Sequence, residues 1–121
     1  MAIKLTEQND GKLLEVEVSG KLQKADYGHF VPEFERLLNA HGKLNVLFVM
    51  KDFHGWEPAA MWEDIKFDAR HFADIERIAM VGDKAWEKAM SAFCRPFTTA
   101  SIRYFDLSAI EYARAWVRWS L

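Results

Sequence analysis

"LNVLFVM", residues 44–50, is the stretch that decides the fold, because it is an almost continuous apolar run in a chain where charged residues are otherwise interspersed. An uninterrupted run of this length is typical of a strand that is buried on both faces. We therefore expect residues 44–50 to form the central strand of a sheet.

The segments around this run switch between the period of a strand and the period of a helix. In "LLEVEVSG", residues 13–20, three aliphatic side chains face one way and two glutamates the other, which predicts a half-exposed strand. Ile3 and Leu5 are expected to form a short first strand, paired to it through the turn "NDG". Residues 75–82 and 101–105 predict two more strands.

Helical patterns separate these strands. They are predicted over residues 26–41, 58–72, 84–95 and 108–119, and Pro32 is expected in the first turns of the first of them. The order of elements predicts a single α/β domain over residues 1–121, with one mixed sheet of about five strands and about four helices. Because the first strands alternate, we expect the helices mainly on one face of the sheet.

The second predicted helix carries a stripe in which Trp62, Ile65, Ala69 and Phe72 recur at helical spacing. Phe67 lies about 140° from Trp62 around the helix axis and does not join this stripe.

The last predicted helix opens with Ser108 and Glu111 in the arrangement of a capping box. Its apolar residues spread over a wide arc. That arc, with an incompletely covered sheet face, predicts a homodimer.

Composition excludes several classes of function. The chain has 121 residues, 50% of them hydrophobic, and a formal net charge of -2, so it lacks the basic footprint of a nucleic-acid-binding protein. The single cysteine, Cys94, cannot form an intramolecular disulfide, and the N-terminus lacks the apolar core of a signal peptide. No apolar run approaches the roughly 20 residues that span a bilayer. A cytoplasmic location is expected.

Catalytic and metal-binding patterns are weak. There is no glycine-rich nucleotide-binding motif and no nucleophile elbow. Asp64, Asp68 and His71 follow helical spacing and could ligate a divalent ion, with His54 and Glu57 nearby, but a solvated helix face explains them more simply.

Cys94 with His71 could form a nucleophile and base, although an inert buried thiol is favoured. We expect no enzymatic activity, no metal and no cofactor.

Aromatic residues make up 14% of the chain, and several large side chains lie where the core pattern does not require them. One interpretation is a generous core with a dimer interface. The other is a groove between the second and third predicted helices that binds an apolar small molecule or lipid. The residues predicted to line this groove are Trp56, Met61, Trp62, Met90, Phe93 and Phe97.

Three cations lie near the rim of the predicted groove: Lys84, Lys88 and Arg95. They could approach the anionic headgroups of a membrane surface, which would place the protein peripherally at the inner face of the membrane. They equally fit an ordinary solvated helix face.

The whole chain resembles the SpoIIAA-like family, which is related in fold to STAS domains. The resemblance rests on "LNVLFVM", "KDFHGWEP" (residues 51–58), "ERIAMVGDKAWEKAMSAFCRPF" (76–97) and "IRYFDLSAIEYARAWV" (102–117). It implies a mixed sheet flanked by helices and no established enzymatic activity. It also implies similarity to lipid-carrying CRAL-TRIO folds, with binding of apolar ligands or association with membranes.

STAS domains that antagonise anti-sigma factors are phosphorylated on a Ser or Thr at the N-terminus of the helix that follows the central strand. Here the corresponding stretch, residues 52–56, contains no hydroxyl residue, and none occurs from Lys51 through Met90. The phosphorylation switch is therefore not expected in this chain. The alternative function is a STAS-type protein-interaction module without that switch, which would meet its partner through the loop from Asp52 to Glu57 and the adjacent helix.

Overall fold

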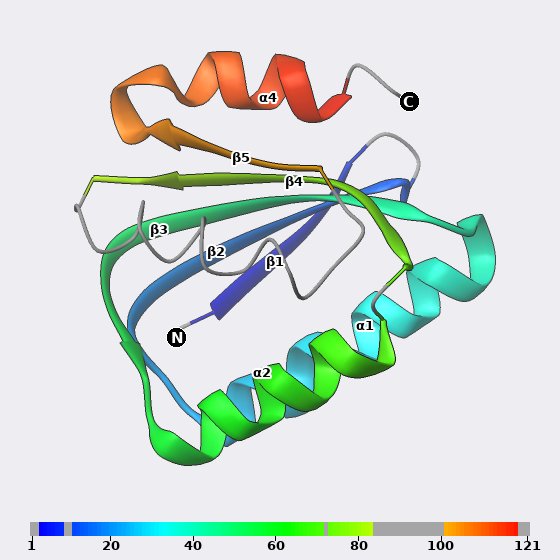
Figure 1. The fold of residues 1–121 in the computed structure, drawn as a ribbon, viewed down its shortest axis with the longest axis vertical. Helices are drawn as coiled ribbons and strands as arrows, with labels where there is room; N and C mark the ends of the chain where they lie inside the picture. Colours follow the sequence, from blue (N-terminus) through cyan, green and yellow to red (C-terminus); the bar gives the residue numbers. More distant parts are fainter. Residues whose placement is uncertain (1–2, 9–10, 72, 84–100, 119–121) are drawn as a thin grey trace.

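The computed structural model describes residues 3–8, 11–71, 73–83 and 101–118. These residues form one five-stranded sheet, three α-helices and a short 3₁₀ helix (Figure 1). The predicted class, α/β with a single mixed sheet, is confirmed. The helix predicted over residues 84–95 lies outside the described residues.

The strands lie side by side in the order in which they occur along the chain. β2 is antiparallel to β1 and parallel to β3, and the remaining neighbours are also parallel. β3 is therefore the central strand, as its apolar run predicts. The bounds are β1 (Ile3–Gln8), β2 (Leu13–Leu22), β3 (Leu44–Trp56), β4 (Ile75–Gly82) and β5 (Ser101–Asp106).

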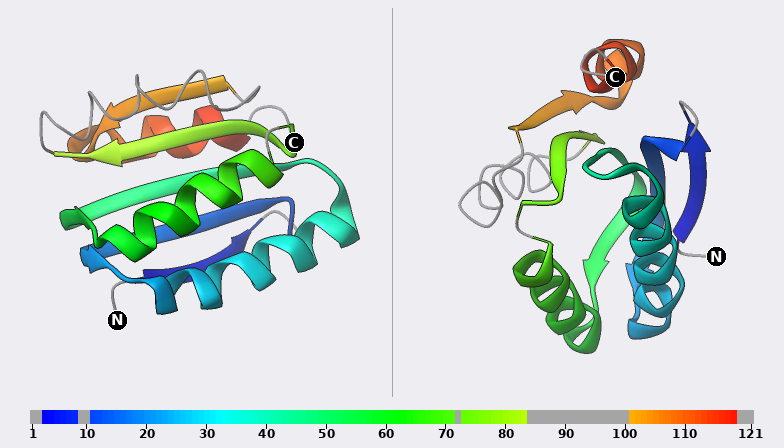
Figure 2. Two further views of the ribbon diagram at one scale, coloured as in Figure 1. Left: turned by 60° about the horizontal axis from the view of Figure 1, so that its bottom comes forward. Right: turned by 90° about the vertical axis from the view of Figure 1, so that its right-hand side faces the viewer.

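Two of the described helices, α1 (Lys24–His41) and α2 (Pro58–Arg70), run side by side on one face of the sheet (Figure 2). α4 (Ile110–Arg118) covers the opposite face, after the 3₁₀ helix η3 (Leu107–Ala109). None of the helices in the described part of the chain is long and apolar enough to cross a membrane.

The central strand divides the core into two layers. Val46 and Met50 belong to the apolar cluster beneath α1 and α2, whereas Leu47 and Val49 pack in a second cluster with Ala113 of α4. Alternate side chains of a strand point to opposite faces, so both faces of β3 can be buried only because helices cover both. The prediction from residues 44–50 is thereby explained.

The boundaries of α1 differ from the prediction at its start. The helix begins at Lys24, where the Asp26 carboxylate accepts a hydrogen bond of 2.8 Å from the Gln23 backbone N–H. Because of this early start, Pro32 lies in the middle of the helix, and its placement in the first turns was wrong. Gly42 ends the helix, with a positive φ of 76°.

The stretch from Asp52 to Trp56 was expected to be a loop, and it is instead the end of β3. Pairing with β2 continues through it with irregular register, since Gly20 lies opposite Phe53. The backbone has a positive φ of 50° at Asp52 and of 94° at Gly55. Phe53 is fully buried. We infer that burial of this ring keeps the stretch in the sheet despite the local distortion.

α4 is attached to the sheet by a buried amide. The side chain of Asn45, which is completely buried, donates to the Val117 carbonyl and accepts from the Arg77 backbone N–H at 3.1 Å. The pairing of β3 with β4 shifts register at this point.

The last helical segment starts earlier than predicted. Ser108 lies inside the 3₁₀ helix η3, so the predicted capping-box start is wrong: the helical segment begins directly after β5.

Candidate functional site

The side of α2 that is buried is not the side that carries the apolar stripe identified in the sequence. Phe67 is only 8% exposed, whereas Trp62 and Ile65 are 61% and 51% exposed. The Phe67 ring packs against Phe34 with centroids 4.9 Å apart and against Phe30 at 5.0 Å. These partners belong to α1, so the pattern within α2 could not reveal them. Of the other predicted members of the stripe, Phe72 and the side chain of Ala69 lie outside the described residues.

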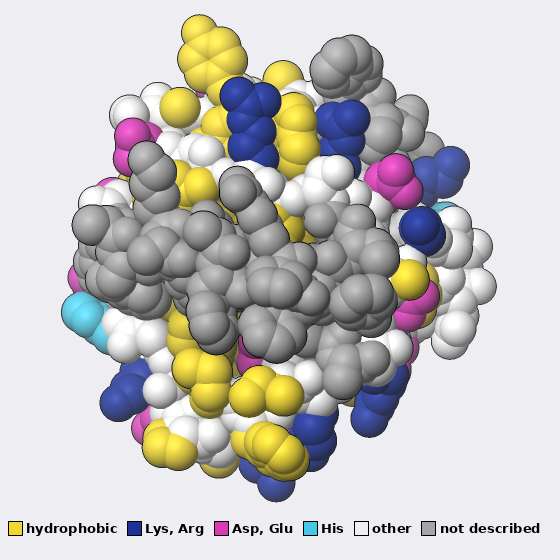
Figure 3. Space-filling view, viewed as in Figure 1, with side chains coloured by type: hydrophobic (Ala, Val, Ile, Leu, Met, Phe, Trp, Pro, Cys, Tyr) yellow, Lys and Arg dark blue, Asp and Glu magenta, His cyan; other side chains and the backbone are white. Residues whose placement is uncertain are grey.

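The outward side of α2 is apolar. Met61 is 43% exposed and lies beside Trp62 and Ile65, within about a third of the helix circumference. We call these three residues the outer stripe of α2. In the space-filling view, apolar side chains gather over this helix (Figure 3). Contiguous exposed apolar side chains usually mark a surface that meets a ligand, a membrane or another protein.

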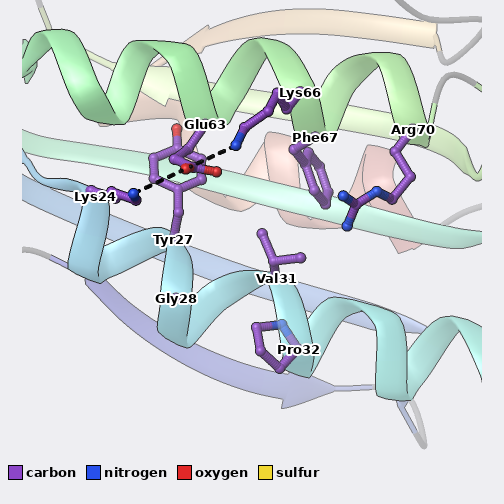
Figure 4. A pocket seen from close by; sticks show the side chains of 9 residues that line it. All are labelled: Lys24, Tyr27, Gly28, Val31, Pro32, Glu63, Lys66, Phe67 and Arg70. Carbon is purple, nitrogen blue, oxygen red and sulfur yellow. Dashed lines mark ion pairs between the residues drawn. The ribbon is translucent and has the colours of Figure 1, made fainter.

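A groove of about 280 Å³ lies between α1 and α2, and we call it the α1–α2 groove (Figure 4). Apolar and aromatic side chains from both helices line it, and three cations and one carboxylate stand among them. The lining residues are Lys24, Tyr27, Gly28, Val31, Pro32, Glu63, Lys66, Phe67 and Arg70.

A hydrogen-bonded relay joins both helices to the end of β3. The Trp56 indole N–H donates to the Tyr27 hydroxyl at 2.8 Å, and that hydroxyl donates to the Asp64 carboxylate at 2.7 Å. Tyr27 is buried, and its ring also forms part of the groove wall. The sequence carries no signal for Tyr27, because its partners are 29 and 37 residues away in the chain.

A second polar cluster holds the C-terminal end of α2. The buried His71 lies between two carboxylates, with its Nδ1 2.7 Å from Asp74 and its Nε2 3.1 Å from Glu35. The metal site suggested by Asp64 and His71 does not form in the part of the chain that the structure describes, where no group of three His, Cys, Asp or Glu side chains is arranged to hold a metal ion. Each of the two has protein partners instead. The Asp68 side chain is outside the described residues.

Three of the six predicted groove residues are described. Trp56 is half-buried at the end of β3, and Met61 and Trp62 are exposed on α2. Met90, Phe93 and Phe97 lie outside the described residues, as do Lys84, Lys88, Cys94 and Arg95. The predicted groove between the second and third helices stays a prediction.

Comparison with known proteins identifies the family. A family model described as SpoIIAA-like matches residues 13–118. The fold is similar to that of an uncharacterised protein with a SpoIIAA-like fold from Shewanella loihica PV-4, with a TM-score of 0.80 and 23% sequence identity, covering 96% of this chain and 92% of the other. None of the curated proteins is a significant match. The family match covers nearly the whole sequence, and the chain therefore belongs to the SpoIIAA-like family.

Proposed function

We propose that the protein is a non-catalytic domain that binds an apolar small molecule or lipid through the α2 side of the sheet. The observation that carries this proposal is the outer stripe of α2. Met61, Trp62 and Ile65 are exposed although the same helix already has a buried side that packs against α1. The fold therefore does not require these three apolar side chains at the surface.

The position of the outer stripe supports a ligand-binding role. The α1–α2 groove lies along the same helix, so apolar surface and a concave site occur together. Fully burying a large apolar side chain contributes about 1.5–3 kcal/mol. Since 61% of the Trp62 surface is exposed, covering it should contribute about 0.9–1.8 kcal/mol, which corresponds to about five- to twentyfold in affinity.

The direct test has two arms. Native mass spectrometry with fatty acids measures binding of single apolar molecules, and co-sedimentation with vesicles containing anionic phospholipid measures peripheral association with a membrane. Trp62→Ala should weaken binding about five- to twentyfold in whichever of the two assays detects binding to the wild-type protein. Tyr112→Ala is the matched control, because Tyr112 is a 75% exposed aromatic residue of α4 on the opposite face.

An absence of binding in both arms would overturn the proposal. Equal losses for Trp62→Ala and Tyr112→Ala would also overturn it, since binding would then not depend on the outer stripe.

The STAS-type interaction module stays the alternative prediction. For that alternative, Trp62→Ala is a better probe than Trp56→Ala, because Trp56 is hydrogen-bonded to Tyr27 and its loss would disturb the fold.

A further inference from the structure

The charges in the α1–α2 groove are unbalanced. The ammonium groups of Lys24 and Lys66 approach the same Glu63 oxygen, at 4.0 Å and 3.1 Å, from opposite helices (Figure 4). One carboxylate thus faces two ammonium groups, so this group of three side chains has a net charge of about +1. The third cation, Arg70, is 3.4 Å from Glu35, a residue that also contacts His71.

Both lysines can bind a second anion while they keep their contact with the Glu63 carboxylate. An ammonium group has three N–H donors, of which Lys66 can direct one at the Glu63 oxygen 3.1 Å away, whereas Lys24, at 4.0 Å, is an ion-pair neighbour too distant for a hydrogen bond. Lys24 and Lys66 are more exposed than the carboxylate between them. A negatively charged group arriving from solvent would therefore reach the two ammonium groups while Glu63 stays beneath them.

The rest of the groove suits a short apolar chain. Tyr27, Val31, Pro32 and Phe67 contribute apolar surface along the cleft between the helices. The groove, with a volume of about 280 Å³, is partly open to solvent, so a short alkyl chain can lie along it with one side exposed.

We propose that the α1–α2 groove binds a short amphipathic anion, whose alkyl chain lies between α1 and α2 and whose headgroup accepts hydrogen bonds from Lys24 and Lys66. This inference rests on the proposed function and specifies the ligand class and the residues that select it. The site differs from the predicted groove between the second and third helices, and the anion is selected by lysines of α1 and α2.

The charge preference can be measured by isothermal titration calorimetry with octanoate and octan-1-ol, which have the same chain length and differ in charge. Octanoate should bind about tenfold more tightly or better, because its carboxylate forms ion pairs with the two ammonium groups, whereas the neutral alcohol can only accept a hydrogen bond from them. Lys66→Met keeps an apolar stem and should remove most of this preference. Lys51→Met is the matched control, since Lys51 pairs with Glu17 at the surface and does not line the groove. Equal affinities for the two ligands in the wild type would overturn the inference.

Gly28 allows the location to be tested without unfolding the protein. It lies inside α1 and lines the groove, and a Cβ built on it meets no atom within 4 Å. Gly28→Leu should raise the melting temperature, because leucine is a much better helix former than glycine, and should weaken octanoate binding more than about tenfold by filling the groove. Octanoate binding that survives in this variant would overturn the assignment of the site.

The two proposals fail in distinguishable ways. If Gly28→Leu leaves fatty-acid or vesicle binding intact while Trp62→Ala weakens it, the groove is not the site and the proposed function stands. If none of the apolar probes binds to the wild-type protein, the proposed function fails, and this inference fails with it.

Discussion

Replacing Phe67 by alanine should destabilise the protein far more than replacing Trp62, although Trp62 is the larger side chain. Phe67 is 8% exposed and its ring centroid lies 4.8–5.0 Å from those of Phe30, Phe34 and His71. Removing a buried phenylalanine costs about 3–5 kcal/mol, because the apolar transfer energy is lost and a cavity remains. Trp62 is 61% exposed, and its replacement should change the free energy of unfolding by about 0.5 kcal/mol or less.

Equilibrium unfolding in urea, followed by far-ultraviolet circular dichroism, measures both variants without relying on tryptophan fluorescence. With a slope of about 2 kcal/mol per molar urea, Phe67→Ala should lower the midpoint by about 2 M and Trp62→Ala by less than about 0.3 M. If the alanine variant is unfolded without urea, Phe67→Leu should still show a loss of about 1–2 kcal/mol. Equal losses, or a larger loss for Trp62→Ala, would refute the orientation of α2 described above.

Three further substitutions test other contacts by the same method. Tyr27→Phe removes the hydroxyl that bonds Asp64 and should cost about 1–3 kcal/mol; a change under about 0.5 kcal/mol would count against the relay. Asn45→Ala removes two buried hydrogen bonds, one of them to Val117, and should cost about 2–4 kcal/mol, so a neutral result would contradict the role of this amide in holding α4. Gly28→Ala should stabilise the protein by about 1 kcal/mol, since the new methyl group meets no atom; a loss of stability would mean that the space beside α1 is filled.

Much of the sheet is predictable because its signals are local. The continuous apolar run of residues 44–50 requires cover on both faces, and β3 is accordingly the central strand with helices on both sides. The alternation in residues 13–20 identifies the buried side of β2, and Leu14 and Val16 lie in the core beneath α1. Each of these predictions uses only the side-chain period of a single segment.

The candidate site was less predictable because its parts come from different segments. α2 has apolar residues on two sides, and its own period favours the side with Trp62 and Ile65. The buried side is decided instead by Phe67, which finds aromatic partners on α1. The strand-like end of β3, expected to be a loop, similarly depends on pairing with β2 around Gly20.

The sequence by itself determined the class of fold, the central strand and the absence of a phosphorylatable residue between Lys51 and Met90. Only the tertiary structure decided which side of α2 is exposed and which charges meet across the α1–α2 groove. The reason is physical: burial on one element leaves a periodic trace in that element alone, whereas Lys24 and Lys66 become neighbours only when two helices far apart in the chain pack side by side on one sheet.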